Sequence, residues 1–129
     1  MKHVLLSSSL TAAAEVELNT TITNSIGSGE VAYIELPFSD DGVTISVNVS
    51  NGSVVIYASD QTTTPNEAFH DWMVETDEYS DVFLDPNELN RPVGDAVYVA
   101  ITGEEEANSF DFMSTSGDTS TQGKPCKVC

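Results

Sequence analysis

The stretch Val43-Thr-Ile-Ser-Val-Asn-Val-Ser50, followed by Asn51-Gly52 and then Ser53-Val-Val-Ile-Tyr-Ala58, decides the fold class. In the first segment apolar and polar side chains alternate, which predicts a strand with one buried and one solvated face. Asn-Gly tolerates the positive φ angles of a type I′ turn, whose twist matches two antiparallel strands. We therefore predict a β-hairpin here and an antiparallel β domain around it.

Similar segments recur along the chain with turn signals between them, and no helix of ordinary length is indicated. Alternation is also clear where Val97, Val99 and Ile101 share one face, and again at Phe110 and Phe112. We predict an all-β protein, an antiparallel β-sandwich of jelly-roll or immunoglobulin-like type with about seven to nine strands. The apolar positions of the first strand should join these five side chains in the core. The other expected strands are 14–18, 31–36, 69–75 and 82–84, and the polar residues 19–29 are expected to be a connection.

The chain divides into a main domain and two flanking segments. Its 129 residues fit one domain with a single core. Residues 14–114 are predicted to form the sandwich. Residues 1–13 resemble a secretory signal only faintly, because their apolar centre is short and interrupted by serines, so we expect mature chain that forms an extended arm or a first strand. Residues 115–129 are rich in Ser, Thr and Gly and are predicted to be a linker that ends in a C-x-x-C pair.

The charge balance narrows the range of partners. The chain has 21 Asp and Glu against 4 Lys and Arg, a net charge of −17. Such a surface repels phosphate backbones and anionic lipids, which argues against nucleic acid. No apolar run approaches the roughly 20 residues of a membrane span, so no membrane insertion is expected. The acidity is compatible with a solvated surface in saline surroundings, with calcium ligands, or with a docking face for a basic partner.

Calcium is the metal that acidic loops would bind, because hard cations take several oxygen ligands. No run of residues matches the EF-hand pattern. The candidate ligands are Asp40, Asp41, Asp77, Glu78 and Asp81, with Asp60 and residues 104–106 as further acidic positions.

No signature of an enzyme is present. Neither His3 nor His70 is surrounded by a Ser-His-Asp or Cys-His pattern. The one suggestive cluster, His70-Asp71-Trp72, is explained without chemistry by a strand that carries a half-buried Trp and polar neighbours. We therefore predict no catalytic residues and no enzymatic activity.

Two kinds of covalent modification are indicated. Asn19, Asn48 and Asn51 begin N-x-Ser/Thr sequons, which are glycosylation sites only where they are exposed in a secreted protein. Cys126 and Cys129 are predicted to form a disulfide, internal or to another chain, or to open a Cys-rich module. A zinc site would need two more ligands, and a thioredoxin-type pair would begin a helix.

The order of features from residue 18 to 114 resembles that of the pre-peptidase C-terminal-like domain, a small β-sandwich appended to many secreted proteins. The segments that carry the resemblance are Glu30–Pro37, Val43–Val49, Val54–Ala58, Phe69-His-Asp-Trp72, Val97–Gly103 and Ser109–Phe112. The resemblance implies an extracellular, non-catalytic module that binds polymers such as collagen or polysaccharide, packs with the help of calcium, or acts as a spacer. The acidic loop at residues 75–81 departs from that pattern.

These observations lead us to expect a structural or adhesive module at the cell surface or outside the cell. It would be a building block of a larger secreted protein or of a self-assembling filament. Its partners would be other copies of itself or neighbouring extracellular modules. The arm carries Val4, Leu6, Leu10 and Ala12 at even spacing, and our hypothesis is that it adds as a strand to a neighbouring copy.

The alternative is an accessory module that binds polysaccharide or calcium. Sugar binding requires aromatic side chains that are exposed on one face of a sheet. The candidates are Tyr33, Tyr57, Tyr79 and Tyr98.

Overall fold

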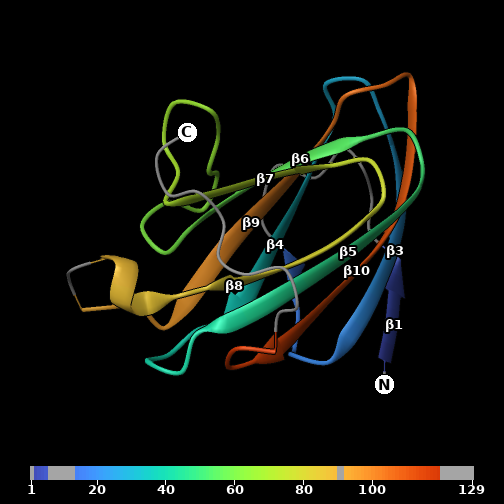
Figure 1. The fold of residues 1–129 in the computed structure, drawn as a ribbon. Coiled ribbons are helices and arrows are strands. Elements are labelled where there is room, and N and C mark those ends of the chain that lie inside the picture. The colour runs from blue at the N-terminus through green and yellow to red at the C-terminus, as the bar shows by residue number, and fades with distance from the viewer. Residues whose placement is uncertain (1, 6–13, 90–91, 120–129) are drawn as a thin grey trace.

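The computed structural model describes residues 2–5, 14–89 and 92–119 of the chain. Ten strands in this part form two five-stranded sheets that pack face to face (Figure 1). The elements are β1 (Lys2–Leu5), β2 (Ala14–Glu15), β3 (Thr20–Gly27), β4 (Val31–Pro37), β5 (Val43–Asn51), β6 (Val54–Ser59), β7 (Trp72–Thr76), β8 (Tyr79–Leu84), the 3-10 helix η1 (Pro86–Leu89), β9 (Ala96–Gly103) and β10 (Ala107–Ser116). We call β1-β3-β10-β5-β8 the β3 sheet and β2-β4-β9-β6-β7 the β4 sheet.

The strands follow a jelly-roll topology. Four antiparallel pairs are nested in the sequence: β3 with β10, β4 with β9, β5 with β8, and β6 with β7. Every connection from β3 to β10 except β6–β7 passes from one sheet to the other. The predicted antiparallel β-sandwich of jelly-roll type is therefore confirmed. At the sheet edges β1 and β2 pair in parallel with β3 and β4, and β2 covers only the first two residues of the strand expected at 14–18.

The prediction that residues 43–58 form a β-hairpin is wrong, because the two strands do not pair with each other. Both strands exist, but β5 pairs with β10 and β8 in one sheet, whereas β6 pairs with β9 and β7 in the other. A type I′ turn needs a positive φ at both central residues. Gly52 has a φ of +80°, but Asn51 is not in the positive-φ region. The Asn51-Gly52 pair therefore forms a corner between the two sheets. The antiparallel partner of β6 that follows it in the sequence is β7.

Asn108 holds this corner from inside. Its side chain is fully buried. The Oδ1 atom accepts hydrogen bonds from the backbone N–H groups of Ser53 at 3.0 Å and Glu105 at 3.1 Å. The Nδ2 atom donates to the carbonyl groups of Ile26 at 3.0 Å and Glu105 at 2.9 Å. One amide thus joins the end of β3, the β5–β6 corner and the β9–β10 turn.

The core between the sheets is the predicted one. The alternating apolar positions of β5, β9 and β10 are all buried: Val43, Ile45, Val47, Val49, Val97, Val99, Ile101, Phe110 and Phe112. Trp72 is 1% exposed, so it is a core residue and not the half-buried one that the sequence suggested. Its ring lies edge-on to Phe38, with centroids 5.9 Å apart. The strand begins at Trp72 and not at Phe69, which is exposed in the preceding loop.

The polar stretch at residues 19–29 was expected to be a connection, and this prediction is wrong. It contains β3, whose inward positions are Thr20, Ile22, Asn24 and Ile26. Two of these four inward side chains are polar, so the alternation of apolar and polar residues that marks a strand is not visible in the sequence. Asn24 lies inside the sandwich, where its Oδ1 atom accepts a hydrogen bond from the N–H of Ser25 at 2.9 Å.

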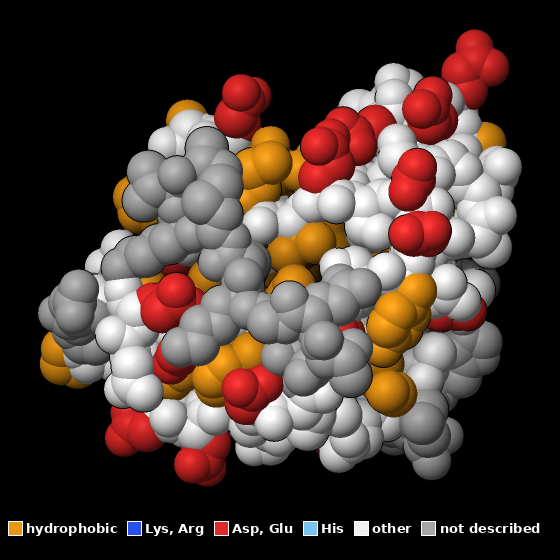
Figure 2. All heavy atoms as spheres, in the orientation of Figure 1, with side chains coloured by type: hydrophobic (Ala, Val, Ile, Leu, Met, Phe, Trp, Pro, Cys, Tyr) orange, Lys and Arg blue, Asp and Glu red, His pale blue; other side chains and the backbone are white. Residues whose placement is uncertain are grey.

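The flanking segments are described only in part. Residues 2–5 form a strand, within the segment 1–13 that was expected to be an extended arm or a first strand. At the other end, β10 extends two residues into the segment that was expected to be a linker. Among the described residues there is no helix with the length and apolar character of a membrane span. Figure 2 shows many Asp and Glu side chains over the face seen in Figure 1. Lys2 is the one Lys or Arg in the described part of the chain.

Candidate functional site

Two of the four candidate tyrosines flank one small residue on the outer surface of the β4 sheet. Tyr33 on β4 and Tyr57 on β6 are both cross-strand partners of Ala100 on β9. Both tyrosines are partly exposed. Ala100 points to the same side but is 0% exposed, because a larger side chain stands on each side of it. The tyrosines are two strand spacings apart, about 10 Å.

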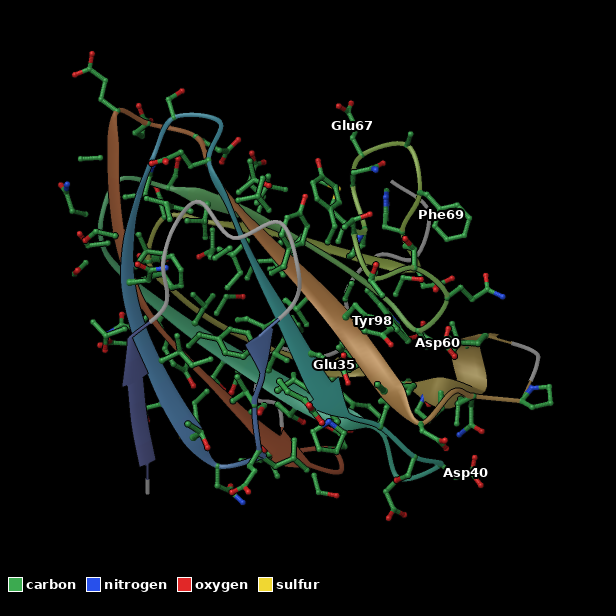
Figure 3. The ribbon with its side chains drawn as sticks, turned by 180° about the vertical axis from the view of Figure 1, so that it is seen from behind. Glu35, Asp40, Asp60, Glu67, Phe69 and Tyr98 are labelled. Carbon is green, nitrogen blue, oxygen red and sulfur yellow. The ribbon has the colours of Figure 1, made fainter. Side chains whose placement is uncertain are left out.

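Tyr98 extends this aromatic surface along β9. It lies two residues before Ala100 and therefore on the same face. Its cross-strand partners are Glu35 on β4 and Ser59 on β6. Figure 3 looks onto this face and shows Tyr98 beside Glu35. We call the surface made by Tyr33, Tyr57, Tyr98 and Ala100 the tyrosine face.

The loop between β6 and β7 borders the tyrosine face. The ring centroid of His70 is 5.1 Å from that of Tyr57. His70 is held there through a hydrogen bond between its Nδ1 atom and the carbonyl oxygen of Asn66 at 3.0 Å. The same loop carries Glu67 and Phe69, and Phe69 is 49% exposed (Figure 3).

The three residues of the suggestive cluster do not form one site. His70 contacts Tyr57 on the outer face, whereas Trp72 points into the core. The Oδ2 atom of Asp71 accepts a hydrogen bond from the hydroxyl of Ser59 at 2.7 Å. These contacts give each of the three a structural role.

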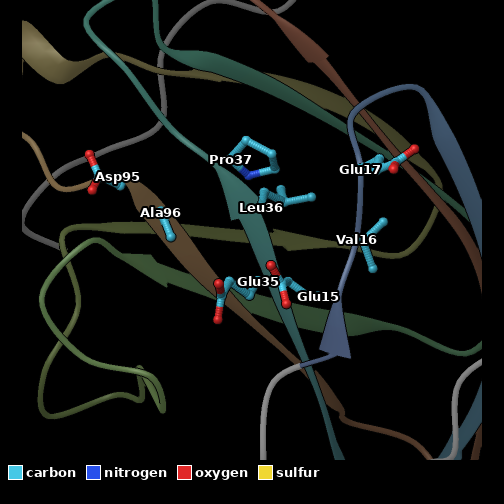
Figure 4. A pocket seen from close by; sticks show the side chains of 8 residues that line it. All are labelled: Glu15, Val16, Glu17, Glu35, Leu36, Pro37, Asp95 and Ala96. Atoms are coloured by element: carbon cyan, nitrogen blue, oxygen red, sulfur yellow. The ribbon is translucent and has the colours of Figure 1, made fainter.

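An acidic depression adjoins the tyrosine face at Glu35, the cross-strand partner of Tyr98. Figure 4 shows the side chains that line it. Its volume is about 510 Å³. Glu15 on β2 and Glu35 on β4 are partners in the parallel pair, so their side chains leave the sheet side by side. The lining residues are Glu15, Val16, Glu17, Glu35, Leu36, Pro37, Asp95 and Ala96. We call this depression the acidic pocket; four of its eight lining residues are carboxylates, and none is Lys or Arg.

A second group of carboxylates lies at the opposite end of the tyrosine face. A depression of about 350 Å³ is lined by Ser53, Glu75, Thr76, Asp77 and Glu104. Desolvation raises the pKa of the Glu104 carboxyl, and the neighbouring Glu75 raises it further. The two groups are separated by the residues of β9 from 96 to 102, a length of about 20 Å.

The tyrosine face lies in a negative field. Burial raises the pKa of the Tyr57 hydroxyl, and the charges of Glu67, Glu104 and Glu75 raise it further. Acidic groups on the β6–β7 loop, in the β9–β10 turn and on β7 thus act on the same hydroxyl. A positively charged group bound here would reduce this repulsion.

Tyr79, the fourth candidate tyrosine, lies on the other sheet. It is 49% exposed on the outer surface of the β3 sheet. Its hydroxyl donates a hydrogen bond to Asp81 Oδ2 at 3.3 Å. The depression next to it, about 230 Å³, includes Asn48, one of the sequon asparagines. Three of the four tyrosines therefore share a face and the fourth does not.

The structure does not bring the calcium candidates together. Asp40 and Asp41 are in the β4–β5 turn, whereas Asp77 and Glu78 are in the β7–β8 turn and Asp81 is buried on β8. These turns lie at opposite ends of β5, about 20 Å apart. No group of three or more His, Cys, Asp or Glu able to hold a metal ion occurs among the described residues. Calcium binding stays a prediction.

The candidate modification sites are placed in part. Asn19, Asn48 and Asn51 are exposed, as glycosylation requires. The Nδ2 atom of Asn51 donates a hydrogen bond to the carbonyl oxygen of Ala107 at 3.2 Å. Cys126 and Cys129 lie outside the described residues. Glycosylation and disulfide formation therefore stay predictions.

Comparison with known proteins gives similar folds but no family for this chain. Neither a family model nor a curated protein sequence matches it. One similar solved structure is PliG from Aeromonas hydrophila, a periplasmic inhibitor of g-type lysozyme, with 14% identity over 88% of this chain and 96% of that chain and a TM-score of 0.47. Another is CsCBM6-3 from Clostridium stercorarium in complex with cellobiose, with 12% identity over 71% of each chain and a TM-score of 0.41.

Proposed function

We propose that this chain is a non-catalytic, extracellular adhesive module that binds a polysaccharide along the outer surface of the β4 sheet. The observation that carries the proposal is that Tyr33, Tyr57 and Tyr98 share one outward face. Aromatic side chains offer a large apolar surface with a polar tip. The C–H faces of pyranose rings stack on such surfaces, while their hydroxyl groups bond to polar groups at the margin.

The shape of the tyrosine face suits an extended chain of sugars. Tyr33 and Tyr57 are about 10 Å apart across Ala100, perpendicular to the strands, so this spacing gives the width of the aromatic surface. The face between its two acidic ends is about 20 Å long. It is an open strip and not an enclosed cavity of the kind that buries a small molecule. Polymer binding is also one of the roles that the pre-peptidase C-terminal resemblance implies.

Binding to cellohexaose and to the hexamer of N-acetylglucosamine, measured by isothermal titration calorimetry, tests this proposal. We expect Tyr33→Ala, Tyr57→Ala and Tyr98→Ala each to weaken binding about threefold to tenfold, as the loss of one aromatic contact predicts. Tyr79→Ala removes an exposed tyrosine from the other sheet and is the matched control. Absence of heat with both hexamers and with the hexamer of glucosamine would overturn the proposal, as would an equal loss in the control.

Assembly into a filament is a second candidate function, and one observation favours it. The strand β1 lies at the edge of the β3 sheet and pairs with β3 alone. The same parallel pairing can be made with β3 of a second copy, as in domain swapping. Negative-stain microscopy of the full chain tests it: filaments that Val4→Pro abolishes would support assembly, and persistent monomers at high concentration would exclude it.

A further inference from the structure

We infer that the polysaccharide is an amino-sugar polymer whose free amines carry positive charge, of the polyglucosamine type. This inference rests on the proposed function, and it adds the chemical class of the ligand. It comes from the carboxylates that stand at both ends of the tyrosine face, where a neutral sugar would need hydrogen bonds alone.

The acidic pocket supplies the first set of contacts. Glu35 is the cross-strand partner of Tyr98, and Glu15 is the partner of Glu35 on the next strand. A sugar stacked on Tyr98 therefore has carboxylates beside it on one side, together with Asp95 at the far wall of the pocket. The volume of about 510 Å³ is sufficient for a sugar ring. Charge-assisted hydrogen bonds from an ammonium group to such carboxylates are roughly twice as strong as neutral ones.

The opposite end offers a second set. Glu75 and Glu104 line the same depression, and the charge of Glu75 is one of the causes that raise the pKa of Glu104. An ammonium group placed between the two carboxylates would reduce the repulsion between them. Ser53 and Thr76 complete the lining there and provide hydroxyl groups for the neighbouring sugar oxygens.

The surroundings exclude the opposite charge. The residues that form the tyrosine face, the acidic pocket and the lining around Glu75 include no Lys or Arg. With a net charge of −17, the chain repels an anionic polysaccharide at long range and attracts a cationic one. Aromatic rings that run between two acidic ends fit a ligand that is apolar on its ring faces and cationic at its edges. A glucosamine polymer has this combination.

Calorimetry at pH 5.5 with hexamers of glucosamine and of N-acetylglucosamine tests the inference, because the two differ in their charged amines. We expect the glucosamine hexamer to bind at least about tenfold more tightly at low salt, and the preference to shrink as salt screens the charges. Glu35→Gln and Glu75→Gln should each reduce the preference for the glucosamine hexamer about threefold to tenfold. Asp111→Asn, on the outer surface of the other sheet, removes the same charge and is the control.

The outcomes separate the two proposals. Equal affinity for both hexamers, or no effect of either Glu→Gln substitution, would overturn the amino-sugar inference and leave polysaccharide binding intact. No heat with either of these hexamers or with cellohexaose would overturn both. Polylysine serves as a probe for non-specific attraction of cations: if the glucosamine hexamer, like polylysine, binds regardless of Tyr57→Ala, the inference also fails.

Discussion

Asn108 and Gly52 are in contact at the corner where the chain passes from one sheet to the other. A Cβ atom at position 52 would overlap the Oδ1 atom of Asn108 and the carbonyl oxygen of Ala107. The φ of +80° at Gly52 is itself unfavourable for other residues. The glycine is therefore required by two independent constraints, backbone conformation and space.

Gly52→Ala should lower the free energy of unfolding by considerably more than the same substitution at Gly29. Both glycines have a positive φ, but a Cβ at Gly29 would meet nothing within 4 Å. The Gly29 variant should therefore lose only the stability that a positive φ costs a residue with a Cβ atom, about 1–2 kcal/mol. We expect the Gly52 variant to lose about 2 kcal/mol more, because the amide of Asn108 must move. Urea unfolding of the two variants measures the difference, and equal losses would show that the corner is not tightly packed.

Asn108→Ala should be among the most destabilising substitutions in β10. It removes four hydrogen bonds to backbone groups at the corner, and we expect a loss of roughly 3 kcal/mol or more. Ser114→Ala, on the same strand, is the control, because the buried hydroxyl of Ser114 has no hydrogen-bond partner. That variant should be neutral or slightly more stable. If urea unfolding gave both variants the same midpoint, the role of Asn108 would be contradicted.

Glu104→Gln should stabilise the protein at high pH and not at low pH. The pKa of Glu104 is raised in the folded state, so its protonated form is favoured by folding. The carboxyl contributes stability at low pH, and this contribution is lost as the pH rises through the raised pKa. Because the side chain is exposed, we expect a gain below about 0.5 kcal/mol. Urea midpoints at pH 4 and pH 8 measure it, with Glu106→Gln in the same turn as the control. A larger gain at pH 4 would contradict the assignment.

Ala100→Leu should weaken sugar binding without removing any tyrosine. The larger side chain would rise between Tyr33 and Tyr57 and interrupt the flat surface that a sugar ring needs. Calorimetry with the hexamers gives the affinity, and urea unfolding shows whether the outer position tolerates the change. Unaltered affinity in a folded variant would mean that the ligand does not cross Ala100.

The sequence was sufficient for the strands whose inward positions are apolar. In β5, β9 and β10 the alternation is clear, and the core followed from it. Sequence-based prediction failed for β3, because the polar residues Thr20 and Asn24 occupy inward positions and obscure the alternation of apolar and polar side chains. It also failed for the Asn51-Gly52 connection. A hairpin and a corner between sheets use the same residues, and the difference is made by Asn108, more than fifty positions away.

The candidate site was predictable only in its components. Period two places Tyr33 with Glu35 and Tyr98 with Ala100, so each pair was assignable to one face of its strand. The neighbouring order of β4, β9 and β6 is long-range information that brings these pairs together. The acidic pocket was missed because Glu15 and Glu35 become neighbours only through the short parallel pair of β2 and β4.

The most direct test of sugar binding on the outer surface of the β4 sheet is a nuclear magnetic resonance titration of the ¹⁵N-labelled chain with the glucosamine hexamer. The amide shifts should change at Tyr33, Tyr57, Tyr98 and Ala100 and leave the outer positions of β5 and β10 unaffected. Shift changes centred on Tyr79 and Asp111, or no saturable change at all, would contradict it.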